Sequence, residues 1–159
     1  GTNNTNWFFL SNITNLLNLS FTTFDILVPG KEYLFKYRAV NIHGNSEFSP
    51  IANIQAANKP LKPNKPITSN YLTFVKINVP SGINDNGSPL TNIRLFIVDI
   101  TNNITEDLSC PFLLSIGFCN LSMNDISLNY GLTNVGFPLK TRIIAVNNYG
   151  DSIISDESI

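Results

Sequence analysis

Residues 33–49 read YLFKYRAVNIHGNSEFS, and residues 139–155 read LKTRIIAVNNYGDSIIS. Both stretches contain the pattern Ala-Val-Asn-x-x-Gly-x-Ser-x-x-Ser. Asn147 lies 106 residues after Asn41 (147 − 41), and the Gly and Ser residues that follow keep the same offset. Agreement of this many positions at one offset is the sequence signature of an internal repeat. The chain of 159 residues is therefore predicted to contain two copies of one structural unit.

The residues around the first copy of the pattern alternate as those of a half-buried β-strand do. Tyr33, Phe35, Tyr37 and Ala39 fall on one face of such a strand, and basic residues fall on the other. Similar strand signals occupy residues 17–21, 72–77 and 93–100, and turn signals occupy 28–30, 43–45, 84–89 and 148–150. No stretch carries a sustained apolar stripe at helical spacing, so little helix is expected. Short strands separated by Gly, Pro and Asn turns indicate an all-β sandwich.

Residues 56–66 read AANKPLKPNKP, with three prolines, three lysines and little to bury. Proline removes ladder donors and favours extended backbone, so this stretch is predicted to be a semi-rigid connector. We expect one unit at residues 1–57, a Pro/Lys linker at 58–66 and a second unit at 67–159.

These features resemble fibronectin type III repeats. In the first unit, the resemblance rests on residues that match the corner before strand F, strand F and the turn into strand G. They are Pro29-Gly30, Tyr33, Phe35, Tyr37, Ala39, Asn41, Gly44, Ser46 and Ser49. In the second unit, it rests on Pro66, on Ile77-Asn78-Val79-Pro80 and on the turn at 86–91, and residues 136–155 repeat the first unit's strands F and G.

The resemblance implies tandem immunoglobulin-like β-sandwiches and a tyrosine corner at Tyr33, whose hydroxyl ties the corner to nearby backbone. The second unit departs from the family pattern, because Ile77 stands where the family has a core Trp and Leu139 stands at the tyrosine-corner position. Its spacing is also slightly long, and we expect the surplus in residues 105–125.

The first sandwich is predicted to be incomplete. Residues 6–28 have room for about two strands, which would be C′ and E, ahead of strands F and G. An isolated half-sandwich would expose strand edges and leave large apolar side chains facing water, namely Trp7, Phe8, Phe9, Phe21 and Tyr37. We expect the missing half to lie N-terminal to this chain or to be donated by a neighbouring copy, which would build a filament.

Cys110 and Cys119 flank an apolar loop and are predicted to form a disulfide; the alternative is two free thiols in a reducing compartment. Two cysteines with His43 far away in sequence cannot make a structural zinc site. The loop between them contains Phe112, Leu113, Leu114, Ile116 and Phe118. It is interpreted as a strand covering the sandwich, with an exposed contact patch as the alternative.

The sequence contains six N-glycosylation sequons of the form Asn-x-Ser/Thr. Asn12, Asn103 and Asn120 fall in predicted loops, and Asn18 alternates outward from its apolar neighbours. Asn86 is set aside because Pro89 follows its Ser and because turn geometry explains Asn86-Gly87 equally well. The candidates for N-linked glycans are Asn3, Asn12, Asn18, Asn103 and Asn120.

Composition and spacing argue against several function classes. The net charge of −1 gives no electrostatic reason to expect nucleic acid as a partner, and no apolar run is long enough to span a membrane. The carboxylates are scattered, and no nucleophile-base pair, phosphate-binding loop or acidic calcium loop is present in the sequence. We therefore expect no catalytic, metal or cofactor site. The basic residues Lys36, Arg38, Lys140 and Arg142 are interpreted as a solvated outer face in each unit.

The function that follows is a non-catalytic structural or adhesive segment of a larger, extracellular, glycosylated surface or filament protein. Its expected partners are neighbouring repeats or copies of itself. One alternative is the ectodomain of a receptor that binds its ligand through residues 82–89 and 105–120. Another is an intracellular cytoskeletal or ciliary scaffold repeat with reduced cysteines and unmodified asparagines.

Overall fold

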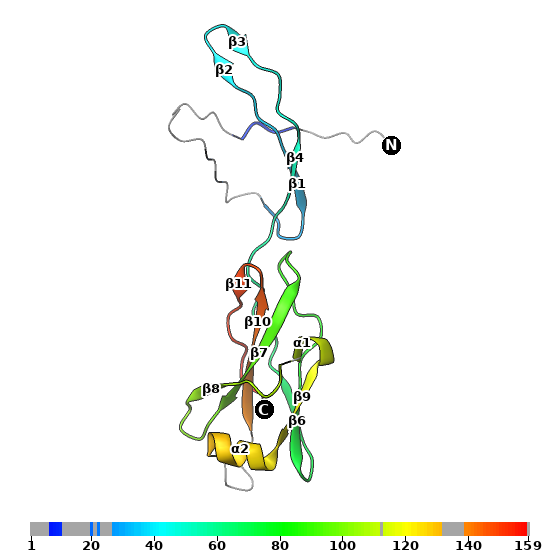
Figure 1. Cartoon of the computed structure of the whole chain (residues 1–159), viewed down its shortest axis with the longest axis vertical. Helices are drawn as coiled ribbons and strands as arrows, with labels where there is room; N and C mark the ends of the chain where they lie inside the picture. The colour runs from blue at the N-terminus through cyan, green and yellow to red at the C-terminus, as the bar shows by residue number, and fades with distance from the viewer. Residues whose placement is uncertain are drawn as a thin grey trace.

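The computed structural model describes residues 7–10, 20, 22, 27–111, 113–131 and 139–158. From residue 67 onward the chain forms a sandwich of two antiparallel sheets. The first sheet has the order β5-β6-β9 and contains β5 (Ile67–Asn70), β6 (Phe74–Asn78) and β9 (Phe118–Ser122). The second has the order β11-β10-β7-β8 and contains β7 (Leu90–Val98), β8 (Ile104–Asp107), β10 (Lys140–Asn147) and β11 (Gly150–Asp151). The expectation of an all-β sandwich is confirmed (Figure 1).

The hydrophobic core lies between these two sheets. Residues along β6 and β10 alternate between buried and partly exposed, which is the period-2 pattern of strands with one face inward. Ile77, Leu95 and Ile143 are among the largest buried side chains of these strands, and each is at most 1% exposed. Ile77, at the position where the family resemblance places Trp, is therefore a core residue despite its smaller side chain.

Two helices interrupt the strand pattern. α1 (Leu113–Ile116) is one turn long and places Leu113 in the core. α2 (Met123–Tyr130) is capped at its start by Ser122, whose hydroxyl accepts a hydrogen bond from the Asp125 N–H, and at its end by Gly131, which has a φ of 64°. The interpretation of the loop after Cys110 as a strand is wrong for 113–116, and β9 begins only at Phe118. α2 was not foreseen because only one of its apolar side chains, Ile126, is buried, so it has no apolar stripe.

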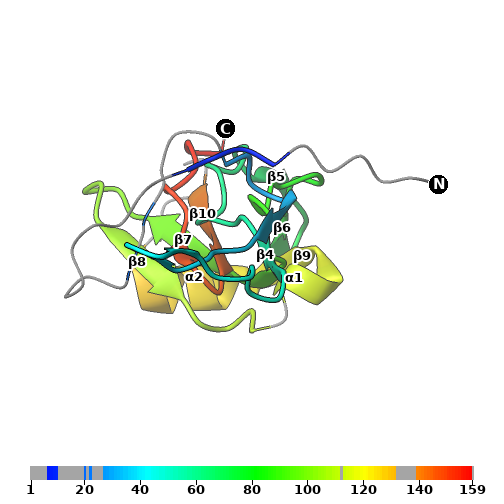
Figure 2. The same cartoon turned by 90° about the horizontal axis from the view of Figure 1, so that it is seen from above.

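The first part of the chain forms two small hairpin pairs. β1 (Glu32–Phe35) pairs with β4 (Ala52–Gln55), and β2 (Val40–Asn41) pairs with β3 (Gly44–Asn45). The strand predicted over 33–39 is therefore shorter than expected, because its regular ladder pairing ends at Phe35. Figure 1 shows these hairpins at the opposite end of the long axis from α2, and Figure 2 gives the view from above, along that axis. The strand expected at 17–21 and the side chain of Phe21 lie outside the described residues.

The connector is packed along the second sandwich. Pro60, Pro63 and Pro66 are all buried, so the expectation that this stretch has little to bury is wrong. Extended proline-rich backbone has about three residues per turn, so prolines three positions apart share one face. The lysines between them fall on the other faces, and Lys62 forms an ion pair with Asp156 at 2.7 Å. The connector is therefore held along much of its length.

The core assignment predicts a contrast between two isoleucines of the C-terminal hairpin. Ile143→Ala should lower the free energy of unfolding by about 2–5 kcal/mol, because its side chain is 0% exposed and truncation leaves a cavity. Ile153→Ala, at a site that is 72% exposed, should change it by less than about 0.5 kcal/mol. Urea unfolding measures both, and equal losses would contradict the proposed core.

Candidate interaction sites

The repeated motif forms a hairpin whose strands are joined through serine hydroxyls. In the second copy, the Ala145 N–H donates to Ser152 Oγ at 3.0 Å, and the Ile143 N–H donates to Ser155 Oγ at 2.9 Å. Each serine N–H donates in turn to the carbonyl of the same strand residue, at 2.8 and 2.9 Å. Each hydroxyl also donates to the carbonyl of the residue that follows it. The two serines thus replace regular ladder pairing and satisfy the backbone of β10.

The first copy has the same bonds. The Ala39 N–H donates to Ser46 Oγ at 2.9 Å, and the Tyr37 N–H donates to Ser49 Oγ at 3.1 Å. The copies differ at the next pair of residues along the hairpin. In the second copy the Thr141 N–H donates to Ser158 Oγ. In the first copy the equivalent residues, Phe35 and Ala52, pair as part of the β1–β4 ladder. The shared motif therefore encodes a local hairpin.

The two hairpins differ in what covers their apolar face. In the second copy, the inward residues of β10 and the preceding Leu139 are all at most 7% exposed; they are Leu139, Thr141, Ile143, Ala145 and Asn147. Their counterparts in the first copy are Tyr33, Phe35, Tyr37, Ala39 and Asn41. Tyr37 is 77% exposed, against 0% for its counterpart Ile143. The predicted exposure of Trp7, Phe8, Phe9 and Tyr37 is likewise observed, at 41–85%.

The Asn of the motif has a second role in the second copy. The side-chain carbonyl of Asn147 accepts a hydrogen bond from the Tyr149 N–H and so shapes the turn, as Asn41 does for His43. The side-chain amide of Asn147 donates to the carbonyls of Asn58 at 2.7 Å and Asp85 at 2.9 Å, with a longer contact to Ser88. Asn147 therefore joins the connector to the loop at 82–89. The sequence showed only its turn role, because the acceptors lie far away in the chain.

Two glycines meet where the first part of the chain contacts the second. The connector binds the loop through the Asn58 N–H to the Asn86 carbonyl (3.0 Å) and the Asn86 side-chain amide to the Lys59 carbonyl (2.8 Å). A Cβ atom on Gly87 would lie 2.2 Å from the Gly30 nitrogen and 2.7 Å from the Ala56 carbonyl oxygen. The backbones are therefore too close for any side chain at Gly87, which also has a φ of 87°.

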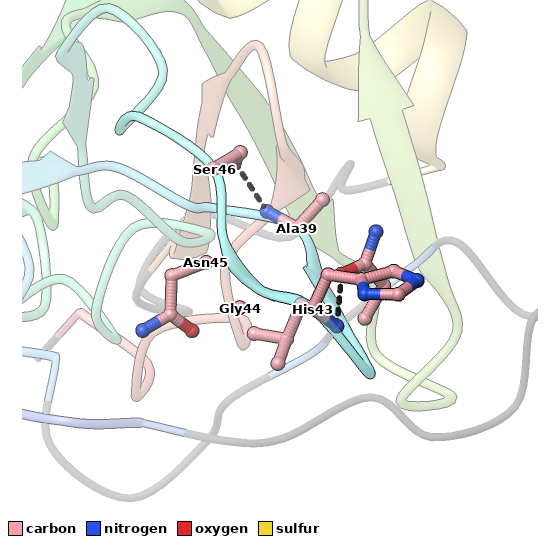
Figure 3. A pocket seen from close by; sticks show the side chains of 7 residues that line it. Ala39, His43, Gly44, Asn45 and Ser46 are labelled. Atoms are coloured by element: carbon pink, nitrogen blue, oxygen red, sulfur yellow. Dashed lines mark hydrogen bonds between the residues drawn. The ribbon is translucent and has the colours of Figure 1, made fainter.

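A surface hollow of about 330 Å³ lies under the first hairpin turn, lined by residues from Ala39 to Ser46 (Figure 3). Two of its polar groups shape the turn, since Ser46 Oγ accepts from the Ala39 N–H and Asn41 Oδ1 accepts from the His43 N–H. In the second copy, the equivalent region is occupied by the connector and the 82–89 loop, through the bonds of Asn147. The hollow is therefore bounded by groups that shape the hairpin turn, and its counterpart in the second copy is filled by other segments of the chain.

The corner before β1 is closed by a tyrosine. The Val28 N–H donates to the Tyr33 hydroxyl at 2.7 Å, in the position where the tyrosine corner was expected. In the second copy, Leu139 at this position is buried in the core cluster and uses packing instead of a hydrogen bond.

The structure joins Cys110 and Cys119 in a disulfide that closes the loop containing α1. Cys119 is buried in the core, and Asp107 next to the loop accepts hydrogen bonds from Ser109 and from the Tyr130 hydroxyl (2.6 Å). Burial, with the Asp107 bond, raises the pKa of Tyr130 above its usual range, so this phenol acts as a donor. The side chains of the loop divide between core and surface, with Leu113 buried and Leu114, Ile116 and Phe118 exposed. Phe112 lies outside the described residues.

Several charged side chains on the outer face of the second sandwich form ion pairs. Arg94 binds Glu106 through two bonds of 2.7 Å and Asp151 at 2.6 Å, and the bond to Arg94 lowers the pKa of Glu106. Arg142 and Lys140 both bind Glu157, and their hydrogen bonds lower its pKa. The interpretation of these residues as a merely solvated face is therefore incomplete.

The basic residues of the first unit contact aromatic rings instead of carboxylates. Lys36 Nζ lies 4.0 Å from the ring centre of Trp7 and 4.1 Å from that of Phe48. Arg38 lies 5.1 Å from Phe48. Neither cation forms a salt bridge with another residue of the described part of the chain.

The sequon asparagines fall into three groups. Asn103 is exposed in the β7–β8 turn, where its side-chain amide donates to Thr101. Asn120 is exposed on β9, which is an edge strand, so its expected place in a loop is wrong. Asn3, Asn12 and Asn18 lie outside the described residues. Both described candidates are accessible from solvent.

The described residues contain no group of three or more His, Cys, Asp or Glu side chains placed to hold a metal ion. Neither helix in that part of the chain is long and apolar enough to cross a membrane.

No protein-family model matches the chain, and no curated protein matches it. Solved structures do match. One contains the titin kinase and its flanking domains, with 18% identity, a TM-score of 0.44 and coverage of 64% of this chain and 17% of that chain. Another is a crystal structure of domains from titin, with 17% identity, a TM-score of 0.47 and coverage of 79% of this chain and 39% of that chain. The alignments thus span well under half of either protein, and the likeness concerns the fold alone.

The hydrogen bonds from strand N–H groups to serine hydroxyls predict that a Ser→Ala substitution changes the free energy of unfolding by different amounts in the two copies. Ser155→Ala should lower the free energy of unfolding by about 1–3 kcal/mol, because it leaves the Ile143 N–H without a partner in a buried strand. Ser49→Ala should change it by less than about 0.5 kcal/mol, because water can replace the hydroxyl beside the exposed Tyr37. Urea unfolding of both variants tests this, and a loss of equal size from Ser49→Ala would contradict it.

Proposed function

We propose that this chain is a segment of a non-catalytic structural protein that holds consecutive fibronectin type III-like sandwiches at a set spacing and angle. The proposed units are residues 1–57 and 67–159, with 58–66 as the connector. The observation that carries the proposal is the junction formed by the connector, the 82–89 loop and the Gly87–Gly30 contact. A spacer needs a defined joint between units, and flexible linkers with no docked contacts do not supply one.

The sheet order supports the fibronectin type III assignment. In immunoglobulin constant-type domains, the sheet that contains strands A, B and E has four strands, and the C–F–G sheet has three. Here the three-stranded sheet is β5-β6-β9, and the additional strand β8 pairs with β7 in the other sheet. The fourth strand of the second sandwich, β8, therefore lies in the sheet that contains the repeated hairpin.

The junction favours a spacing role over ligand recognition by the 82–89 loop. The Asn84 and Asn86 carbonyls accept hydrogen bonds from the Leu61 and Asn58 N–H groups of the connector. Side-chain amides of Asn86 and Asn147 add bonds in the same place. A loop whose backbone is used in this way has fewer groups left for a ligand, which weakens the receptor alternative at this loop.

The disulfide supports an extracellular location for the proposed structural protein. Disulfides persist in oxidising compartments and are rare in the cytosol. The exposed sequon asparagines Asn103 and Asn120 are compatible with N-linked glycans in the same setting. The partners proposed are neighbouring repeats and copies of the same protein.

The rigidity of the junction is tested by substituting Gly87. Gly87→Ala should loosen the joint, because its Cβ would overlap the backbone of Gly30 and Ala56, and overpacking costs about 1–3 kcal/mol. Spin labels at the exposed positions Lys31 and Leu128 report the distance between the two units by pulsed electron resonance. The unsubstituted chain should give one narrow distance distribution, and Gly87→Ala should broaden it.

Gly82→Ala is the matched control. Gly82 has a similar φ of 71°, but a Cβ there meets nothing within 4 Å. Its substitution therefore carries the local backbone strain without the contact between units, and its distribution should stay narrow. A broad distribution in the unsubstituted chain, or no difference between the two variants, would refute the spacing role.

The location is tested by intact-mass measurement of the protein isolated from its native source, with and without glycosidase and reductant. An extracellular protein should lose glycan mass and gain about 2 Da on reduction of the Cys110–Cys119 disulfide. Two free thiols and an unmodified mass would instead favour the intracellular scaffold alternative. Removal of the glycan should leave the label distances unchanged, since neither Asn103 nor Asn120 takes part in the junction.

A further inference from the structure

We propose that the first hairpin unit is a strand acceptor: the edge of residues 34–41 that faces away from β3 and β4 binds a β-strand from outside these 159 residues. The incoming strand would run antiparallel to residues 34–41. It would carry branched apolar residues on its inward face and carboxylates on its outward face. This inference goes beyond the spacing role and does not depend on it.

The second copy shows what the first copy lacks. There, β10 has the serine-bridged segment on one edge and pairs with β7 on the other edge, from Lys140 to Asn147. In the first copy, β4, β3 and the two serines occupy the equivalent of the first edge. Within the described residues, no strand pairs with the second edge of β1 or β2. An unpaired edge is a template for another strand.

The backbone direction identifies the amides that face the open edge. The Tyr37 and Ala39 N–H groups donate to the serines, so they point toward β3 and β4. N–H groups alternate in direction along a strand, so those of Lys36 and Arg38 point the other way. They are the donors that an incoming strand would engage.

The register of the second copy fixes the chemistry of the inward face. Ile143 lies opposite Leu95, and Ala145 lies opposite Ile93. With the offset of 106, the corresponding residues of the first copy are Tyr37 and Ala39. A strand with Leu- and Ile-like residues opposite them would cover the ring of Tyr37, which is now 77% exposed.

The charges fix the chemistry of the outward face. Within the described residues, Lys36 and Arg38 contact aromatic rings and form no ion pair, whereas Arg142, the counterpart of Lys36, is paired with Glu157 of its own hairpin. Opposite charges on directly facing residues stabilise strand pairs. We therefore assign carboxylates to the two outward positions opposite Lys36 and Arg38.

The hollow beside Asn41 supports the same conclusion. The side-chain amide of its counterpart Asn147 donates to carbonyls of the connector and of the 82–89 loop. Within the described residues, Asn41 uses only its carbonyl oxygen, toward the His43 N–H. Its amide is therefore available to a carbonyl of the incoming polypeptide, in the hollow shown in Figure 3.

The test uses the 159-residue chain and a synthetic peptide. The peptide copies residues 90–99 with Arg94→Glu and Phe96→Glu, so that it keeps the inward apolar residues and carries two outward carboxylates. A control peptide also carries Ile93→Ser, Leu95→Ser and Ile97→Ser. Fluorescence anisotropy measures binding, and hydrogen exchange by NMR measures protection of single amides. The first peptide should bind at least about tenfold more tightly than the control, since three buried apolar side chains are lost in the control.

Two variants of the chain locate the site. Tyr37→Asp should weaken binding at least about tenfold, and its fold should be unaffected because Tyr37 is exposed in the free chain. Leu72→Asp, at a fully exposed position in the second sandwich, should leave binding unchanged. Binding should slow hydrogen exchange at the Lys36 and Arg38 amides, while the amides of Tyr37 and Ala39 serve as already bonded references.

Three results would overturn the proposal. Equal affinity of the two peptides would show that no specific strand site exists. Protection of the Lys36 and Arg38 amides in the free monomer would show that the chain covers its own edge. Sedimentation of the free chain as a dimer that Tyr37→Asp dissociates would assign the face to a second copy.

Discussion

The antiparallel pairing of β7 with β10 is the constraint on which the rest of the sandwich depends. It places Leu95 opposite Ile143 at the centre of the core and brings Arg94 beside Asp151 at the outer face. It also carries Asn147 to the end of the sheet, where the connector enters. The absence of such a partner beside residues 34–41, in the described part of the chain, explains why a nearly identical hairpin leaves Tyr37 exposed. The pairing with β7 is thus the difference between the buried hairpin of the second copy and the exposed hairpin of the first.

The hairpin itself needs no such partner. Its bonds run from strand amides to serine hydroxyls a few residues away, as between Ala39 and Ser46, so the motif carries its own hydrogen-bond acceptors. This explains why both copies have the same geometry although one is buried and the other exposed. Burial of the apolar face, in contrast, depends on segments far away in the chain. The two copies therefore show that the hairpin geometry depends on local hydrogen bonds, whereas burial of its apolar face depends on distant segments.

The same distinction decides what the sequence could predict. The repeat, the strand alternation and the pairing of Cys110 with Cys119 were visible because they depend on periodicity or on residue type. The buried prolines of the connector were missed, since the connector is held by bonds to residues far away in the sequence, such as Asn86 and Asp156. α2 was missed because it buries one apolar residue, Ile126, and so has no stripe. The domain boundaries and the glycans remain predictions.

Asn41 and Asn147 show how a repeated residue acquires different roles. Each forms the same turn through its side-chain carbonyl, which the motif encodes. Only Asn147 also has carbonyls from Asn58 and Asp85 in reach of its amide. In this chain the Asn147 amide and the Gly87–Gly30 contact lie at the same junction. A turn residue of the motif thus also holds the connector where the first part of the chain meets the second.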